Sequence, residues 1–429
     1  MTRIYYGWWI VAATFSVLFV CAGIGFFTYP VFIKYIDAEM QWGRDSLSNA
    51  GAISALAAGF ATPPIGYVID RFGARAVMLP GAILLSTCYF LLSRINSIGG
   101  FYLLFLLIGI GMAATTILPS QTLVSKWFDR KRGRAMGMVT LAGGLGGVIW
   151  IRLSTTLIET MNWRRTYEIL GALILAISFP LILFVIRNSP HSMGLKIEGG
   201  DDETTGTQVT QPIPIVESGY SIGEAIVTKA FWLIVLSTFS GVFAGSGFGL
   251  HVIAFLTDSG LSSKAASTLW SFTLGMSIAS TFFFGFFSEK RQKRYLAGTS
   301  QVVRALCLVL LILIARKAAS VPPGAMPLIL FAVVYGLSLG CLNVVSPLLI
   351  SETFGIKAFG KVMGMLGIPF TVGMALGQVV GGRLFVLHNN YIGAFSVFAI
   401  ALFLAGVSIG FVKPRFSVQA QRVDAGSVE

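Results

Sequence analysis

The chain has 429 residues, of which 55% are hydrophobic and only 11% are charged, and its mean hydropathy is +0.80. Soluble domains carry about 25% charged residues, so this composition excludes an ordinary soluble protein. The formal net charge of +13 does not require a nucleic acid, because an anionic inner membrane leaflet attracts basic segments equally well. We therefore expect a lipid bilayer as a partner, and no nucleic acid.

Apolar runs recur from one end of the chain to the other. A helix of about 20 apolar residues crosses a hydrocarbon layer of about 30 Å, and at this length only helices satisfy their own backbone there. In chain order, the predicted spans are 8–36, 47–69, 76–93, 100–125, 133–158, 166–187, 230–257, 264–287, 295–315, 326–351, 358–387 and 391–412. The sequence therefore predicts an all-α polytopic membrane protein with twelve transmembrane helices in two six-helix bundles.

The connection between the sixth and seventh spans contains GGDDETTGTQVTQPIP, which is too hydrophilic to cross a membrane. We predict an N-terminal six-helix bundle over 1–187, a cytoplasmic linker over 188–228 and a C-terminal six-helix bundle with a cytoplasmic tail over 229–429. With the N-terminus inside, most of the 31 lysines and arginines fall in the inner segments. The positive-inside rule then predicts that both termini face the cytoplasm, in the cytoplasmic (inner) membrane.

The two halves of the chain resemble each other at equivalent connections. The pairs are GYVIDRFGARAVM (66–78) with GFFSEKRQKRYLA (285–297), and WFDRKRGRAMGM (127–138) with TFGIKAFGKVMGM (353–365). A duplicated six-span unit is a recurrent design of transporters that bind substrate between two lobes. No nucleotide-binding loop, metal cluster or nucleophile–base arrangement stands out, so the sequence predicts a transporter without enzyme activity, cofactor or metal.

The loop after the second span resembles the conserved G-x-x-x-D-R-x-G-x-R motif of the major facilitator superfamily. The matching residues are Gly66, Asp70, Arg71, Gly73 and Arg75. A carboxylate at the cytoplasmic end of a span can accept hydrogen bonds from the N-terminus of a neighbouring helix, and can release them in another state. We predict that this motif forms a conformational latch; the alternative interpretation is a turn with solvated charges.

Three further stretches look like the monocarboxylate transporter family, and most of all its bacterial branch of the oxalate–formate antiporter type. They are YYGWWIV (5–11), WFDRKRGRAMGMVTLAGGLGG (127–147) and LHVIAFLTDSGLS (250–262). The resemblance implies transport of small carboxylates such as lactate, pyruvate, oxalate or formate. The chain departs from that family at Ser280, which stands where members often carry an arginine in the eighth span, and at Met276 and Val31, which replace charged residues of the animal members.

Arg152 places a permanent positive charge inside the fifth predicted span. An arginine at the bilayer centre costs about 2.5–3.5 kcal/mol on insertion scales, so such a residue usually faces a cavity or a partner. A guanidinium also binds a carboxylate bidentately, which suits a small organic anion. We predict that Arg152 binds the substrate; pairing with Glu159 or another helix, and snorkelling to the outer interface, are the alternatives.

Other polar residues inside the spans are further candidates. His251, in the seventh span, is a candidate substrate ligand and proton carrier, because an ordinary histidine titrates near pH 6.5; a buried histidine satisfied by a neighbour is the alternative. The uncharged substrate-binding candidates are Tyr29, Tyr335, Asn343 and Gln378, which need partners in a membrane and find them in each other or in substrate. Arg304, in the ninth span, is interpreted as a snorkelling or structurally paired residue.

The sequence as a whole predicts a secondary active transporter for a small organic anion. We expect a monomeric symporter or antiporter that works by alternating access, with protons as a candidate coupling ion. One alternative is an efflux transporter for a hydrophobic small molecule. An alternative from another class is a transporter-like membrane sensor.

Overall fold

The structure is a computed structural model that describes residues 5–128, 131–195, 220, 222–287, 292–317, 326–355 and 359–414. The longer helices are α1 (Gly7–Phe27), α2 (Tyr29–Met40), α3 (Arg44–Phe72), α4 (Ala74–Leu92), α5 (Ile98–Thr115), α6 (Ile117–Trp127), α7 (Arg132–Met161), α8 (Trp163–Pro180), α10 (Lys229–Asp258), α11 (Ser263–Phe287), α12 (Lys293–Lys317), α13 (Met326–Phe354), α14 (Phe359–His388) and α15 (Ile392–Gly410). Short helices are η1 (Leu181–Val185), η2 (Pro190–Met193) and α9 (Ile222–Val227). Each predicted span contains a helix, which confirms the all-α fold class.

Eleven helical segments within the described residues are long and apolar enough to cross a membrane. One of them, Ile98–Trp127, joins α5 and α6, and another, Trp163–Val185, continues α8 into η1. The helix α11 fills the eighth predicted span but is not among the eleven; serine and threonine recur along it. The chain is therefore a multi-pass membrane protein.

Contacts divide the described residues into two compact units. The first takes its residues from Met1–Asp202, Gly249–Gly275 and Gly382–Asn389, and the second from Glu203–Phe248, Met276–Gly381 and Asn390–Glu429. The helices α10, α11 and α14 therefore contribute one part to each unit. The predicted bundle and linker boundaries, at 187 and 228, remain a prediction.

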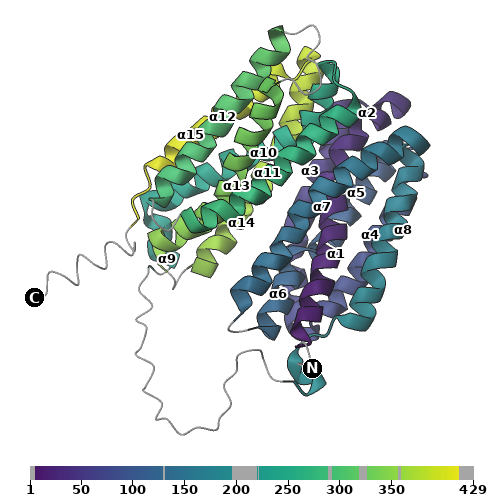
Figure 1. Cartoon of the computed structure of the whole chain (residues 1–429), viewed down its shortest axis with the longest axis vertical. Helices are drawn as coiled ribbons and strands as arrows, with labels where there is room; N and C mark the ends of the chain where they lie inside the picture. The colour runs from purple at the N-terminus through teal and green to yellow at the C-terminus, as the bar shows by residue number, and fades with distance from the viewer. Residues whose placement is uncertain are drawn as a thin grey trace, which may run out of the picture. The chain divides into compact units, whose positions relative to one another are not determined.

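In the first unit α1 packs along α7, as Figure 1 shows, and the two backbones meet at a pair of glycines. A Cβ added to Gly146 would lie 2.5 Å from the carbonyl oxygen of Phe19 and 2.8 Å from the Cα of Gly23. Small residues allow membrane helices to approach closely. One turn further along α7, Trp150 donates its Nε1–H to the same Phe19 carbonyl over 3.0 Å, so this crossing is closed by packing and by a hydrogen bond.

The aromatic N-terminal stretch of the chain packs against the end of α6. The rings of Tyr5 and Trp127 lie 6.1 Å apart in an edge-to-face arrangement. Trp127 donates its Nε1–H to the carbonyl of Arg187 over 2.9 Å, and the Tyr6 hydroxyl donates to Val185 over 2.9 Å. Two of the stretches that resemble the monocarboxylate transporter family, 5–11 and 127–147, thus meet at the end of η1.

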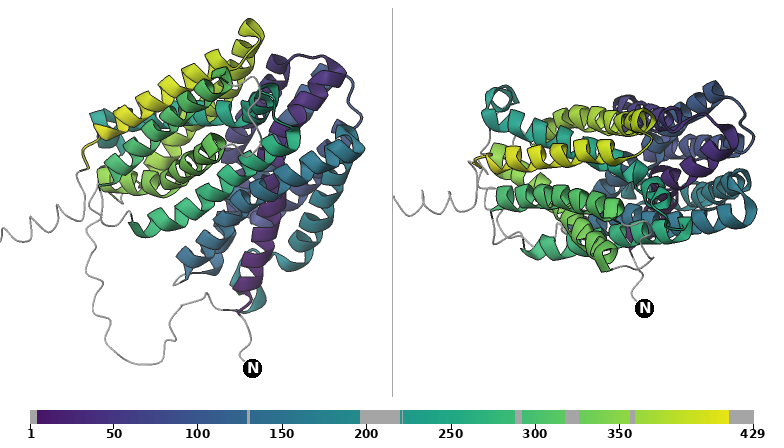
Figure 2. Two further views of the ribbon diagram at one scale, coloured as in Figure 1. Left: turned by 45° about the horizontal axis from the view of Figure 1, so that its top comes forward. Right: turned by 90° about the horizontal axis from the view of Figure 1, so that it is seen from above.

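In the second unit α12 packs along α13 and α15, and Figure 2 shows the yellow α15 beside the green α12. The N-terminal end of α12 is tied to α13 by an ion pair between Lys293 and Glu352, whose side-chain atoms lie 2.9 Å apart. Both side chains are largely buried, with 14% and 17% exposed. This pair fixes the end of α12 against α13.

Arg304 lies inside the second unit and is only 3% exposed, so it does not snorkel. Its guanidinium donates to Gln301 Oε1 over 3.0 Å and to the Tyr335 hydroxyl over 3.1 Å, and lies 5.0 Å from the centre of the Tyr335 ring. A Cβ added to Gly245 of α10 would meet Arg304 Nη2 at 2.9 Å. The missing side chain at Gly245 therefore makes room for the buried charge.

The contact between α1 and α7 gives a first prediction, because α7 carries two glycines with opposite surroundings. Gly146 faces the backbone of α1, whereas a Cβ at Gly143 meets nothing within 4 Å. We expect Gly146→Ala to destabilise the protein by about 1–3 kcal/mol through overpacking. We expect Gly143→Ala, the matched control, to be neutral or to stabilise it by about 0.5–1 kcal/mol. Thermal unfolding in detergent measures both, and equal behaviour of the two variants contradicts the close crossing.

Candidate functional site

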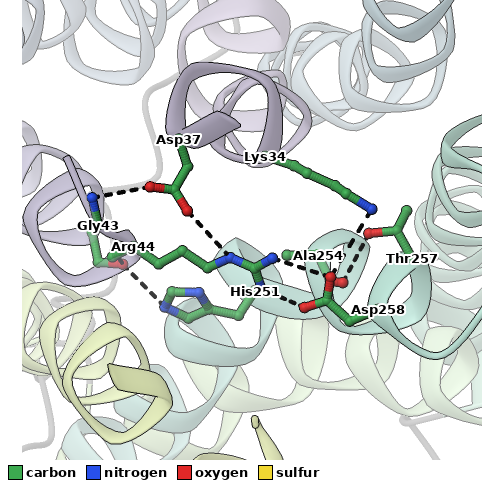
Figure 3. Close-up of polar contacts among 9 residues, drawn as sticks. Lys34, Asp37, Gly43, Arg44, His251, Ala254, Thr257 and Asp258 are labelled. Atoms are coloured by element: carbon green, nitrogen blue, oxygen red, sulfur yellow. Dashed lines mark hydrogen bonds and ion pairs between the residues drawn. The ribbon is translucent and has the colours of Figure 1, made fainter. Parts of the chain in front are cut away.

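A cluster of charged side chains in the first unit joins α2, α3, α10 and α14. This ion-pair cluster consists of Lys34, Asp37, Arg44, Asp45, Asp258 and Arg383. Figure 3 shows Arg44 between Asp37 and Asp258, with Lys34 on the far side of the Asp258 carboxylate. Arg44 binds Asp258 bidentately, with Nη1 on Oδ2 and Nη2 on Oδ1 at 3.0 Å. Its Nε lies 3.8 Å from Asp37 Oδ2, and Lys34 Nζ lies 4.0 Å from Asp258 Oδ1.

Local structure explains why these side chains converge. Arg44 is the first residue of α3 and Asp258 is the last residue of α10, so both charges stand at helix ends. Asp37 accepts a hydrogen bond from the Gly43 N–H over 2.9 Å and so fixes the turn before α3, where Gly43 adopts a φ of +83°. The guanidinium of Arg44 also lies 4.2 Å from the ring centre of Phe385 in α14. Only 10% of the Arg44 side chain is exposed.

The helix α14 adds a further ion pair to the cluster. Arg383 Nη1 lies 3.8 Å from Asp45 Oδ2, with 67% of the arginine side chain exposed. The two backbones come close at Gly382, where a Cβ would lie 2.5 Å from Ser48 Oγ and 2.9 Å from the Asp45 Cα. The pairing of Arg44 with Asp258, 214 residues away, was not foreseen in the sequence. The available signal was only that opposite charges stand at span ends on the same predicted side.

His251 of α10 is fully buried. It lies beside Arg44 of α3, as Figure 3 shows. Its Nε2 is 3.4 Å from Ser48 Oγ, and that hydroxyl lies 2.5 Å from the backbone carbonyl of Arg44. A serine hydroxyl has one proton to donate, and the shorter contact takes it. With the serine proton directed to that carbonyl, a hydrogen bond to His251 needs Nε2 as the donor.

Tyr29 of α2 contacts Leu47 of α3, the residue before Ser48. Its hydroxyl donates to the backbone carbonyl of Leu47, and its ring lies 4.5 Å from that of Phe105. Tyr29 is only 7% exposed. The structure therefore brings Tyr29 and His251 to successive residues of α3, and in both cases the observed partner belongs to the protein.

Arg152 has a different environment from the ion-pair cluster. It is exposed on α7, and its Nη1 donates to the Thr268 hydroxyl of α11. The two helices also touch at Val148 and Gly275, where an added Cβ would lie 3.9 Å from the valine. Among the described residues no carboxylate pairs with Arg152, and the expected alternative partner Glu159 makes no hydrogen bond or ion pair there.

Ser280, at the place of the family arginine, is a packing residue of the second unit. It is fully buried, and its hydroxyl donates to the backbone carbonyl of Leu337 in α13. The two helices are very close here, because a Cβ on Gly340 would lie 2.6 Å from the Ser280 Cβ. The space that an arginine would need at this place is taken by α13.

The remaining substrate candidates all lie in the second unit. Tyr335 of α13 is 1% exposed and accepts the hydrogen bond from Arg304. Asn343 of α13 is exposed, and Gln378 of α14 is half-buried. The six candidates are thus divided between the two units, with Arg152, His251 and Tyr29 in the first. Their roles in substrate binding remain predictions.

The predicted latch motif begins inside α3 at Gly66 and forms a tight turn at Gly73, between α3 and α4. Gly73 adopts a φ of +87°, and a Cβ there would lie 2.1 Å from the Asn188 side chain. That asparagine accepts a hydrogen bond from the Arg75 N–H over 3.1 Å, and the Arg75 guanidinium donates to the Leu183 carbonyl over 2.6 Å.

The two charges of the motif at the end of α3 are exposed. Arg71 lies over the Phe72 ring at 5.3 Å, and Asp70 makes no side-chain contact of hydrogen-bond or ion-pair type within the described residues. The turn therefore has a structural reason, whereas the latch role of Asp70 remains a prediction. Among the residues that the structure describes, no group of three or more histidines, cysteines and acidic residues could hold a metal ion.

Comparisons with known proteins agree with this architecture. The "Oxalate:formate antiporter" of Oxalobacter formigenes is 25% identical over 410 residues, which cover 93% of this chain and 90% of that protein. "Monocarboxylate transporter 12" of Mus musculus is 22% identical over 427 residues, covering 95% and 85%. The crystal structure of a bacterial homologue of the human lysosomal transporter Spinster, inward-facing and occupied, superposes with a TM-score of 0.69 at 16% identity, covering 96% and 95%.

The likeness to the Spinster homologue shows the fold alone. The oxalate:formate antiporter and the monocarboxylate transporter match the resemblance seen in the sequence. The family model described as Major Facilitator Superfamily matches residues 15–321 and 269–425. These findings point to a family of transporters for small molecules and not to a family of enzymes. The chain belongs to the Major Facilitator Superfamily and is a membrane transporter of that family.

Proposed function

We propose that the chain is a secondary active transporter that moves a small organic anion, a monocarboxylate or a related carboxylate, across the cytoplasmic membrane by alternating access. The observation that carries this proposal is Arg152, an exposed guanidinium within a span, held by a hydroxyl and by no acid among the described residues. An arginine side chain stays charged at physiological pH. Its planar fork binds carboxylate and phosphate groups bidentately.

The other basic residues inside or at the edges of the spans are less suited to this role. They are Lys34, Arg304 and Arg383. Lys34 and Arg383 face carboxylates in the ion-pair cluster, and Arg304 is buried between neutral partners. The equivalent of the family arginine is the buried Ser280. Arg152 is therefore the cation that an incoming anion can reach, and the oxalate:formate antiporter among the relatives supports a carboxylate as that anion.

The coupling of this transport has two candidate forms. Anion exchange needs no titrating group in the protein, whereas proton symport needs a carrier such as His251, whose Nε2 lies 3.4 Å from Ser48 Oγ. Uptake in the presence of an imposed pH gradient separates these forms. We further propose that the protein acts as a monomer with both termini in the cytoplasm, which the lysine and arginine bias supports.

We propose that the ion-pair cluster closes the outer side of the transporter in one of its states. The helices α2 and α3 come from the first half of the sequence, and α10 and α14 come from the second half. Movement of the halves in alternating access has to break the pairs that join them. The partly exposed pairs of Lys34 and Arg383 suit a contact that must open in every cycle, since such pairs typically contribute only about 0–1 kcal/mol each.

The proposed anion site predicts the result of counterflow in proteoliposomes. We expect saturable exchange of at least one of radiolabelled oxalate, formate, lactate and pyruvate. Loss of a hydrogen bond to a charged group costs about 1.5–3 kcal/mol, so we expect Arg152→Ala to raise KM about tenfold or more, with folding intact. Arg165→Ala, which removes an exposed surface charge paired with Glu168, is the control and should leave exchange unchanged.

Two outcomes contradict this proposal. Exchange that is unchanged in Arg152→Ala removes Arg152 from the site. Absence of exchange for all four carboxylates, together with export of a hydrophobic compound, favours the efflux alternative instead.

The ion-pair cluster predicts the outcome of a double-mutant cycle. Arg44→Asp and Asp258→Arg each place like charges together, so we expect each to slow exchange and to lower the thermal unfolding midpoint. The charge-swapped double variant should recover part of both losses, with a coupling energy of about 0.5–3 kcal/mol. Recovery is partial because the swapped charges then stand beside like charges at Asp37 and Lys34. A double variant that is worse than either single variant contradicts direct pairing. Arg165→Asp, at an exposed pair within one helix, is the control for general charge effects.

A further inference from the structure

Thr268 is the described partner of the Arg152 guanidinium, and its hydroxyl has a fixed direction. It lies in the second turn of α11 and donates to the carbonyl of Lys264 over 2.6 Å. Because a threonine hydroxyl has a single proton, this bond leaves only lone pairs to face other groups. The contact with Arg152 Nη1 is therefore one in which the arginine donates and the threonine accepts.

This contact constrains a side chain that is otherwise long and flexible. Threonine is β-branched, and its rotamer in a helix is set when Oγ1 binds the carbonyl one turn earlier. The helix that carries it is itself fixed against α7, at Val148 and Gly275. With Nη1 held by Thr268, the opposite edge of the guanidinium, formed by Nε and Nη2, has no partner among the described residues and can bind a carboxylate bidentately.

The chemistry of the partner matters as much as its position. An acid at residue 268 would orient Arg152 equally well, but it would also neutralise the charge and compete with an anionic substrate. A hydroxyl acceptor orients the guanidinium and leaves its full positive charge in place. Thr268 therefore orients Arg152 as a binding group for anions, whereas an acid in its place would form a structural ion pair.

We propose that Thr268 is a positioning residue, which holds Arg152 so that its Nε–Nη2 edge faces one carboxylate group of the transported anion. This inference rests on the proposed function of Arg152. In this chain α11 supplies the orienting hydroxyl, and α7 supplies the charge.

The test is counterflow of radiolabelled oxalate, formate and lactate in proteoliposomes with three variants. Thr268→Val keeps the shape and the β-branch but removes the acceptor, whereas Thr268→Ser keeps the acceptor. Thr273→Val is the matched control, because Thr273 makes the same bond one turn back, to Leu269 over 2.9 Å, in the same helix. We expect Thr268→Val to raise KM about three- to tenfold with little change in maximal rate. Thr268→Ser and Thr273→Val should behave like the unchanged protein.

The possible results separate this inference from the proposed function. An unchanged KM in Thr268→Val, with transport impaired in Arg152→Ala, overturns the positioning role and leaves the anion site intact. A lower maximal rate at constant KM in both Thr268 variants indicates a structural role and also overturns it. Unchanged transport in Arg152→Ala, or no exchange of any of the three anions by the unchanged protein, overturns the proposed function and this inference with it. Thr268→Ala serves as the second variant without an acceptor if the valine variant is unstable.

Discussion

A charge inside a membrane protein has to be compensated by hydrogen bonds, and the choice of compensating group divides the basic residues of this chain into two classes. At the helix ends Arg44 and Lys293 face carboxylates. Within the spans Arg152 and Arg304 face hydroxyl and amide groups only, as far as the structure describes the chain. Removing a charge from water is expensive, and a neutral partner repays part of that cost without cancelling the charge. Of these two unneutralised charges, Arg304 is buried and Arg152 is exposed, which is why the proposed anion site is placed at Arg152.

Ion pairs at helix ends and close backbone contacts between helices suit different parts of a transport cycle. Acid–base pairs between α3, α10 and α14 attract over some distance and re-form easily after they break, as a closing contact requires. Tight backbone contacts such as that of Gly23 with Gly146 cannot open gradually, since packed helices are either in contact or separated. Helices joined in this way move as one body. The glycine crossing of α1 and α7 thus keeps Arg152 on a rigid support.

The sequence predicted the helices well and the contacts between them poorly. Span lengths follow from bilayer thickness, so each predicted span contains a helix, and the connection between the second and third spans falls at Gly73, between α3 and α4. The pairings of Arg44 with Asp258 and of Arg152 with Thr268 join residues that are 214 and 116 positions apart, and no periodicity encodes such distances. Arg304 was interpreted as a snorkelling or structurally paired residue, and the structure shows the buried, paired form, for which Gly245 leaves the space. A missing side chain on one helix is a signal only when its neighbour is known.

The absence of a described acid beside Arg152 has an electrical consequence. In the proposed anion site, Arg152 gives the empty site one positive charge, and a bound monoanion neutralises it. Moving one charge across a potential of 100 mV involves about 2.3 kcal/mol. The membrane potential therefore acts on the return of the empty carrier and leaves the step loaded with a monoanion almost unaffected. A transporter of this kind works most easily when each departing anion is replaced by another.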